Sequence, residues 1–237
     1  MKKYLSLLCV IGCFSQPVWA ANNINLSNFG AAQPAFKTFS EDLGSALSYK
    51  PVTPPAPLGI TGFDIGLEVT STKMRNLDLA TNSSLTNLVV PKLHVYKGLP
   101  LNIDVGAFYS AVPTTTNIKL YGGELRYAIL EGGVALPAVG IRAAMTKLTG
   151  VSQLALTTKS LDVSVSKGFA MFTPYAGIGR VWVDSTPDAA SGLTKETFQQ
   201  GKIFVGGNLN FGLTNVAFEY DKTGTAPSYS VKLGFRF

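Results

Sequence analysis

The sequence predicts an all-β fold: a closed antiparallel transmembrane β-barrel of about ten strands, with one short helix ahead of it. From Leu58 to Phe237, apolar and polar side chains alternate with a period of two, as in strands that have two different faces. Only 14% of the 237 residues are charged, well below the roughly 25% of soluble domains. The first residues also carry an export pattern. Together these observations favour a barrel in a bacterial envelope.

Residues 1–20, MKKYLSLLCVIGCFSQPVWA, have a basic start, an apolar stretch and a small residue at the end. This pattern is typical of a secretory signal peptide, with cleavage expected between Ala20 and Ala21. The alternative is a lipoprotein, because the letters VIGC ending at Cys13 resemble a lipobox, although little sequence precedes them. Cys9 and Cys13 both lie in this segment, so we expect no disulfide in the exported chain.

The formal net charge is +6, and the basic residues stand singly along the chain. A nucleic-acid site needs a clustered basic stripe, so nucleic acid is not expected as a partner. The chain has one histidine, His94, and no cysteine after Cys13. Neither a metal site nor a cofactor is therefore expected.

Residues 21–57 are predicted to form a periplasmic segment. Apolar residues recur at intervals of three and four from Phe36 to Leu47, which predicts a helix over 35–48, although Gly44 lies inside it. The letters PVTPPAP, from Pro51 to Pro57, predict a stiff extended linker. Two placements of the helix stay open: on the periplasmic leaflet, or as a plug in the barrel mouth.

Residues 58–237 are predicted to form the barrel. Ten alternating segments are expected at 58–72, 87–97, 100–112, 117–131, 134–148, 154–167, 170–184, 199–212, 213–222 and 227–237, with boundaries uncertain by about 2–4 residues. Connections after the even segments are tight, whereas those after the odd segments tend to be longer and polar. An even strand count with short turns at one end is typical of outer-membrane barrels.

The alternation alone also fits a soluble β-sandwich. The polar face is rich in glycine, serine and asparagine and carries isolated charges, which favours a confined lumen over a solvated surface. Thirteen ionisable residues fall in phase with this face and are predicted to form a paired lumen network: Asp64, Glu68, Lys92, His94, Asp104, Glu124, Arg126, Arg142, Asp162, Lys202, Glu219, Lys232 and Arg236. Arg180 fits either face. Many aromatic residues lie near strand ends, as in an interfacial girdle, although strands favour aromatics in any case.

The last strand, SYSVKLGFRF, alternates up to the terminal Phe237, and TPYAGIGRVW has a glycine-aromatic texture. With the signal peptide, these features resemble bacterial outer-membrane β-barrel proteins, most closely the small barrels of the outer-membrane protein A and W type. GITGFDIGLEV resembles the first strand of a proteobacterial branch of these barrels. The resemblance implies contact with outer-membrane lipid, both chain termini in the periplasm, and insertion by the barrel assembly machinery. The assembly signal would be formed by Tyr229, Val231, Leu233, Phe235 and Phe237.

No catalytic residue is predicted, because His94 has no sequence partner that defines a catalytic geometry. The expected function is that of a structural barrel, or of a narrow, porin-like pore or binding barrel for small solutes or hydrophobic compounds. Two alternatives stay open. One is a lipid-modifying or proteolytic barrel enzyme that uses His94. The other is a surface adhesion or interaction protein that uses loops 74–86 and 185–198.

Overall fold

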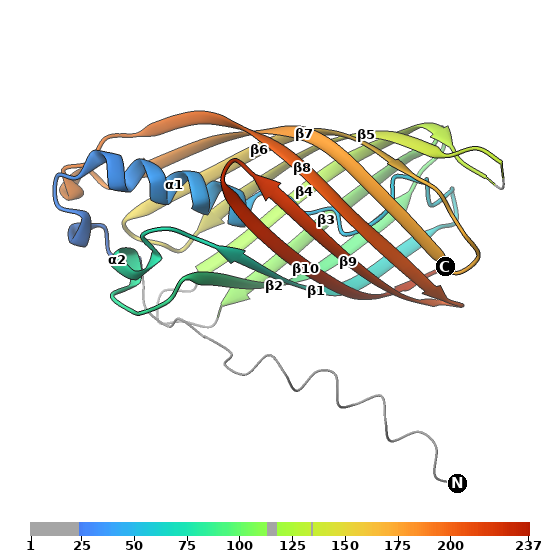
Figure 1. The fold of residues 1–237 in the computed structure, drawn as a ribbon, viewed down its shortest axis with the longest axis horizontal. Helices are drawn as coiled ribbons and strands as arrows, with labels where there is room; N and C mark the ends of the chain where they lie inside the picture. The colour runs from blue at the N-terminus through green and yellow to red at the C-terminus, as the bar shows by residue number, and fades with distance from the viewer. Residues whose placement is uncertain (1–23, 113–117, 134) are drawn as a thin grey trace, which may run out of the picture.

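Ten antiparallel strands close into one barrel (Figure 1). The computed structural model describes residues 24–112, 118–133 and 135–237, so the predicted signal peptide with Ala20 and Ala21 lies outside the described residues. The strands are β1 (Phe63–Lys73), β2 (Asn87–Gly98), β3 (Ile103–Val112), β4 (Ile118–Glu131), β5 (Ala138–Thr149), β6 (Leu154–Ser166), β7 (Phe172–Pro187), β8 (Glu196–Phe211), β9 (Thr214–Thr223) and β10 (Ala226–Arg236). Each strand pairs with its neighbours in sequence, and β10 pairs with β1. The predicted fold class is confirmed, and the sandwich alternative is excluded.

The seam between β1 and β10 runs from Asp64 opposite Arg236 to Thr72 opposite Ser228. Beyond the paired strands, the backbone amide of Phe63 donates to the carbonyl of Phe237 at 2.6 Å, and the reverse bond is 3.0 Å. The two rings lie 5.6 Å apart. The terminal aromatic residue therefore lies at the end of the closing seam. The first strand begins later than predicted, because Leu58 to Gly62 form a turn in which Gly59 has a φ of +78°.

The outer surface of the barrel is mostly apolar. Leu67 is 66% exposed, Ile178 66% and Leu233 53%, while the polar side chains between them point inward and are buried. A water-soluble protein rarely exposes a continuous apolar surface of this size. This surface is that of a barrel surrounded by lipid.

The remaining elements are α1 (Gln33–Leu47), α2 (Leu77–Thr81) and the 3₁₀ turns η2 (Leu26–Phe29) and η3 (Ala189–Ser191). Helix α1, blue in Figure 1, lies inside one end of the barrel, opposite to the end where β10 finishes. Gly44 faces β7 so closely that a Cβ atom there would lie 2.7 Å from Cγ2 of Val183. The glycine that weakens the helical pattern is thus required for packing. No described helix is long and apolar enough to cross a membrane.

The chain after α1 threads the lumen toward the Phe237 end. Ser45 bonds to the carbonyl of Ala226 at the start of β10, and Thr53 accepts from Arg236 at the end of that strand. Of the two helix placements, the interior one is observed. Helix α1 and Phe237 lie at opposite ends of the barrel. The predicted periplasmic location of segment 21–57 and the predicted periplasmic location of Phe237 are therefore incompatible for α1.

Candidate functional site

The lumen is filled by ion pairs, several of which lie near the Phe237 end. Asp64 accepts from Lys232 at 3.0 Å and from Arg236 at 2.8 Å. Asp104 pairs with Arg126 at 2.7 Å. These groups come from β1, β3, β4 and β10, whose side chains alternate between lipid and lumen. Paired in this way, they avoid the cost of an isolated buried charge.

Seven of the eight remaining predicted lumen charges form two groups, and the eighth, Glu219, binds the threaded segment. Glu68 pairs with Lys92 at 2.7 Å and with His94 at 2.5 Å. The second group joins four strands: Arg142 pairs with Asp162 at 2.5 Å and with Glu124 at 3.6 Å, and Lys202 lies 3.8 Å from Asp162. Twelve of the thirteen predicted residues are buried, and the side chain of Arg236 is 25% exposed.

The threaded segment is held by the lumen charges. Lys50 pairs with Asp221 at 2.7 Å, and both side chains are fully buried. The backbone amide of Val52 donates to Glu219 at 3.1 Å, and Lys202 donates to the carbonyl of Tyr49 at 2.8 Å. Further bonds join Arg126 to the carbonyl of Pro54 and the amide of Leu58 to Asp104. The lumen therefore binds an extended peptide that belongs to the same chain.

Two residues of this arrangement were missed by the sequence prediction. Asp221 shares the phase of Glu219 on β9, so the alternation could have found it. Lys50 precedes the proline-rich linker, where no periodicity reports which way a side chain points. Arg180, which fitted either face, points outward and is exposed.

His94 is fully buried in the lumen wall. Its Nδ1 atom lies 3.1 Å from the hydroxyl of Tyr96, and its ring stacks on Phe108. Tyr96 in turn donates to the carbonyl of Pro51. The histidine thus packs between the barrel wall and the threaded segment.

An ion pair attaches α1 to the barrel rim next to β1. Arg75, just after β1, donates to both carboxylate oxygens of Asp42, at 2.9 Å and 2.7 Å, and also lies 3.5 Å from Glu41. Hydrogen bonding to Asp42 raises the pKa of the Arg75 guanidinium above its ordinary value. On the other side of the helix, Ser40 lies 2.9 Å from Ser185 of β7 through the two hydroxyl oxygens. The helix is therefore held at both sides of the barrel mouth.

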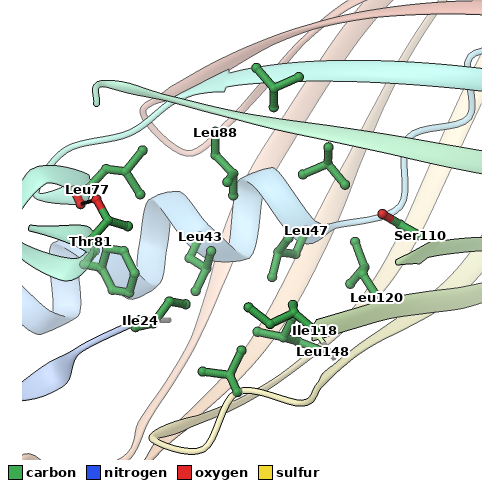
Figure 2. A pocket seen from close by; sticks show the side chains of 14 residues that line it. Ile24, Leu43, Leu47, Leu77, Thr81, Leu88, Ser110, Ile118, Leu120 and Leu148 are labelled. Atoms are coloured by element: carbon green, nitrogen blue, oxygen red, sulfur yellow. Dashed lines mark hydrogen bonds between the residues drawn. The ribbon is translucent and has the colours of Figure 1, made fainter. Parts of the chain in front are cut away.

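An apolar pocket lies between α1 and the rim of strands β2 to β5. Figure 2 shows Leu43 and Leu47 of the helix close to Ile118, Leu120 and Leu148 of the wall. Its volume is about 100 Å³, and Thr81 and Ser110 provide the few polar groups among its lining residues. An apolar space of this size and lining can hold a small apolar molecule.

No group of three or more histidine, cysteine, aspartate or glutamate side chains in the described part of the chain could hold a metal ion. No protein-family model matches the sequence, and a comparison with curated proteins found no match.

Solved structures share the barrel architecture at low identity. The translocator domain of autotransporter NalP from Neisseria meningitidis is 12% identical, with a TM-score of 0.40, covering 87% of this chain and 96% of that one. The N-terminal barrel domain of Pseudomonas aeruginosa OprF is 10% identical with a TM-score of 0.30, covering 73% and 97%. A loop-deletion mutant of OmpT, an outer membrane protein of Vibrio cholerae, is 13% identical with a TM-score of 0.35, covering 74% and 62%. The present chain therefore spans less than two thirds of that OmpT chain. These neighbours are bacterial outer-membrane β-barrels, and similarity at this level assigns no function.

Proposed function

We propose that this protein is a non-enzymatic barrel of the bacterial outer membrane, closed by its own N-terminal segment, that binds a small apolar compound at its rim. The observation that carries the proposal is the pocket between α1 and strands β2 to β5. Apolar ligand sites in proteins are concave and lined mostly by hydrophobic side chains with few polar groups. The lining of this pocket fits that description.

The filled lumen supports binding rather than constant passage of solutes. Side chains just fill a barrel of eight strands, whereas water-filled porins have about sixteen. This barrel has ten strands, and it contains a helix and an extended segment as well. A solute pathway would require α1 to move away from Val183 and Arg75.

Binding can be tested with fluorobenzene, a single-ring compound of about the size that such a cavity holds. The protein is placed in nanodiscs, and ¹⁹F NMR records the line width of fluorobenzene at increasing concentrations. Wild-type protein is expected to give saturable broadening beyond that of empty nanodiscs. Leu120→Phe, which fills the pocket, should abolish the saturable part. Leu161→Phe adds the same ring atoms on the lipid-facing side of β6 and serves as the matched control. Equal broadening by wild type and Leu120→Phe would contradict the proposal.

Two other functions remain to be tested. An enzyme that uses His94 would lose activity on lipid or peptide in a His94→Ala variant, but the burial of His94 favours a packing role. An adhesion protein would lose cell binding when loops 74–86 and 185–198 are shortened. The α2 and η3 turns lie in these loops and support small, ordered loop surfaces.

A further inference from the structure

A ring of outward-facing basic side chains surrounds the α1 half of the barrel. Each lies on a different strand, in the phase that points toward lipid, and each is exposed. This basic ring consists of Lys73, Lys119, Lys147, Lys159, Arg180 and Lys222. Four of its members follow one another on the adjacent strands β4, β5, β6 and β7.

The strand register places the basic ring at nearly one height along the barrel axis. Following the paired residues once around the barrel gives a stagger of about 12 residues, which for ten strands means a tilt of about 40°. At this tilt Lys73, Lys119 and Lys147 share one level, because each lies at the α1 end of its strand. Lys159, Arg180 and Lys222 lie about 4–6 Å closer to the Phe237 end.

The position of the basic ring matches one boundary of a membrane. By the same geometry it lies roughly 25 Å from Phe237, about the height of the apolar band of an outer-membrane barrel. Two amphipathic aromatic residues lie beside members of the basic ring: Tyr121 is opposite Lys147 on the neighbouring strand, and Trp182 is opposite Lys159. Toward Phe237 the outward positions are mainly aliphatic, such as Leu161, Ile178 and Leu233.

The charges of the basic ring have few acidic neighbours among the described residues, and only at longer range does Lys159 interact with Asp184. In the described part of the chain, none of the six side chains forms an ion pair. Asp184 is the outward acidic residue of the described strands in this half, and Lys195 pairs with it at 3.2 Å. Unpaired cations at the headgroup level attract anionic lipid, as juxtamembrane basic clusters do.

We propose that the basic ring binds the phosphate groups of anionic lipids in the leaflet at the α1 end. This inference rests on the proposed membrane location of the barrel and is independent of the rim pocket. Lysine and arginine form charge-assisted hydrogen bonds with phosphate oxygens, while Tyr121 and Trp182 contact the adjacent acyl chains and glycerol region. The lipid would thereby hold the barrel at one depth, with α1 at the level of the headgroups.

Trp182 provides the test, because it is the one tryptophan outside the predicted signal peptide and it pairs with Lys159. The protein is folded into vesicles of phosphatidylcholine and phosphatidylglycerol in which one lipid or the other is brominated. Quenching of Trp182 by each brominated lipid gives the relative binding constant of the anionic lipid at this site. Wild type is expected to prefer phosphatidylglycerol at least threefold at low salt, and the preference should fall as salt rises.

The triple variant Lys147→Gln, Lys159→Gln and Arg180→Gln should bring the relative constant to about one. The control Lys37→Gln, Lys97→Gln and Lys195→Gln removes the same charge from exposed or partly exposed positions outside the basic ring and should keep the preference. If the triple variant fails to fold, Lys159→Gln alone should at least halve the preference. Equal quenching by both lipids in wild type would overturn the inference while leaving the membrane barrel intact. Absence of quenching by either lipid would instead overturn the membrane location.

Discussion

Lys50 and Asp221 show at the residue scale how the lumen holds the threaded chain. Both are fully buried, 2.7 Å apart, and Lys50 also donates to the carbonyl of Ser45. Removing one member of such a pair leaves an uncompensated buried charge, which costs about 3–5 kcal/mol. Replacing both members with neutral side chains of similar size removes that cost.

We therefore predict that Lys50→Met and Asp221→Asn each lower the free energy of unfolding by about 3–5 kcal/mol. The double variant should be more stable than either single variant, with the coupling given by the double-mutant cycle. Urea unfolding in phosphatidylcholine vesicles, followed by the gel mobility of folded and unfolded protein, measures this effect. The matched control is Lys195→Met, since Lys195 and Asp184 form an exposed pair worth about 0–1 kcal/mol. Additive losses in the double variant would contradict the pairing.

Helix α1 is the element that closes the barrel mouth. It contacts β1, β6, β7, β8 and β10, and Gly44 allows its close approach to Val183. The periodicity from Phe36 to Leu47 predicted the helix within two residues at its start and one at its end. The same periodicity could not predict its location, because an apolar stripe packs equally well on a leaflet or inside a barrel.

Deletion of residues 35–47 is predicted to raise single-channel conductance in planar bilayers, because it removes the helix from the lumen. The matched control keeps the helix and locks it with cysteines at Ser40 and Ser185, whose hydroxyl oxygens lie 2.9 Å apart. Under oxidising conditions the disulfide-locked variant should keep the low conductance of the closed barrel. Its conductance should therefore be lower than that of the deletion variant. Unchanged conductance after deletion would show that the ion-pair network alone closes the lumen.

The whole molecule is a lipid-facing surface wrapped around a polar interior, the inverse of a soluble domain. An apolar exterior of this extent requires lipid or detergent, and strands that close on themselves leave no unpaired edge in the membrane. We predict that the protein fractionates with outer membranes and migrates faster on a gel when it is not heated, because the closed barrel resists detergent. Arg236→Ala removes a partner of Asp64 near the seam and should lower the temperature of the mobility change. Recovery of wild-type protein free in the periplasm would refute the membrane location.

The sequence by itself determined the strands, their inward and outward faces and the paired nature of the lumen charges. These follow from a period of two, which is local and needs no knowledge of distant partners. Only the tertiary structure decided where α1 and the linker lie, that Lys50 meets Asp221, and that six basic residues on separate strands reach nearly one height. Those relations depend on barrel closure and stagger, which join residues more than a hundred positions apart. The alternation that ends at Phe237 predicts a strand. Only the pairing of that strand with β1 closes the barrel around the lumen.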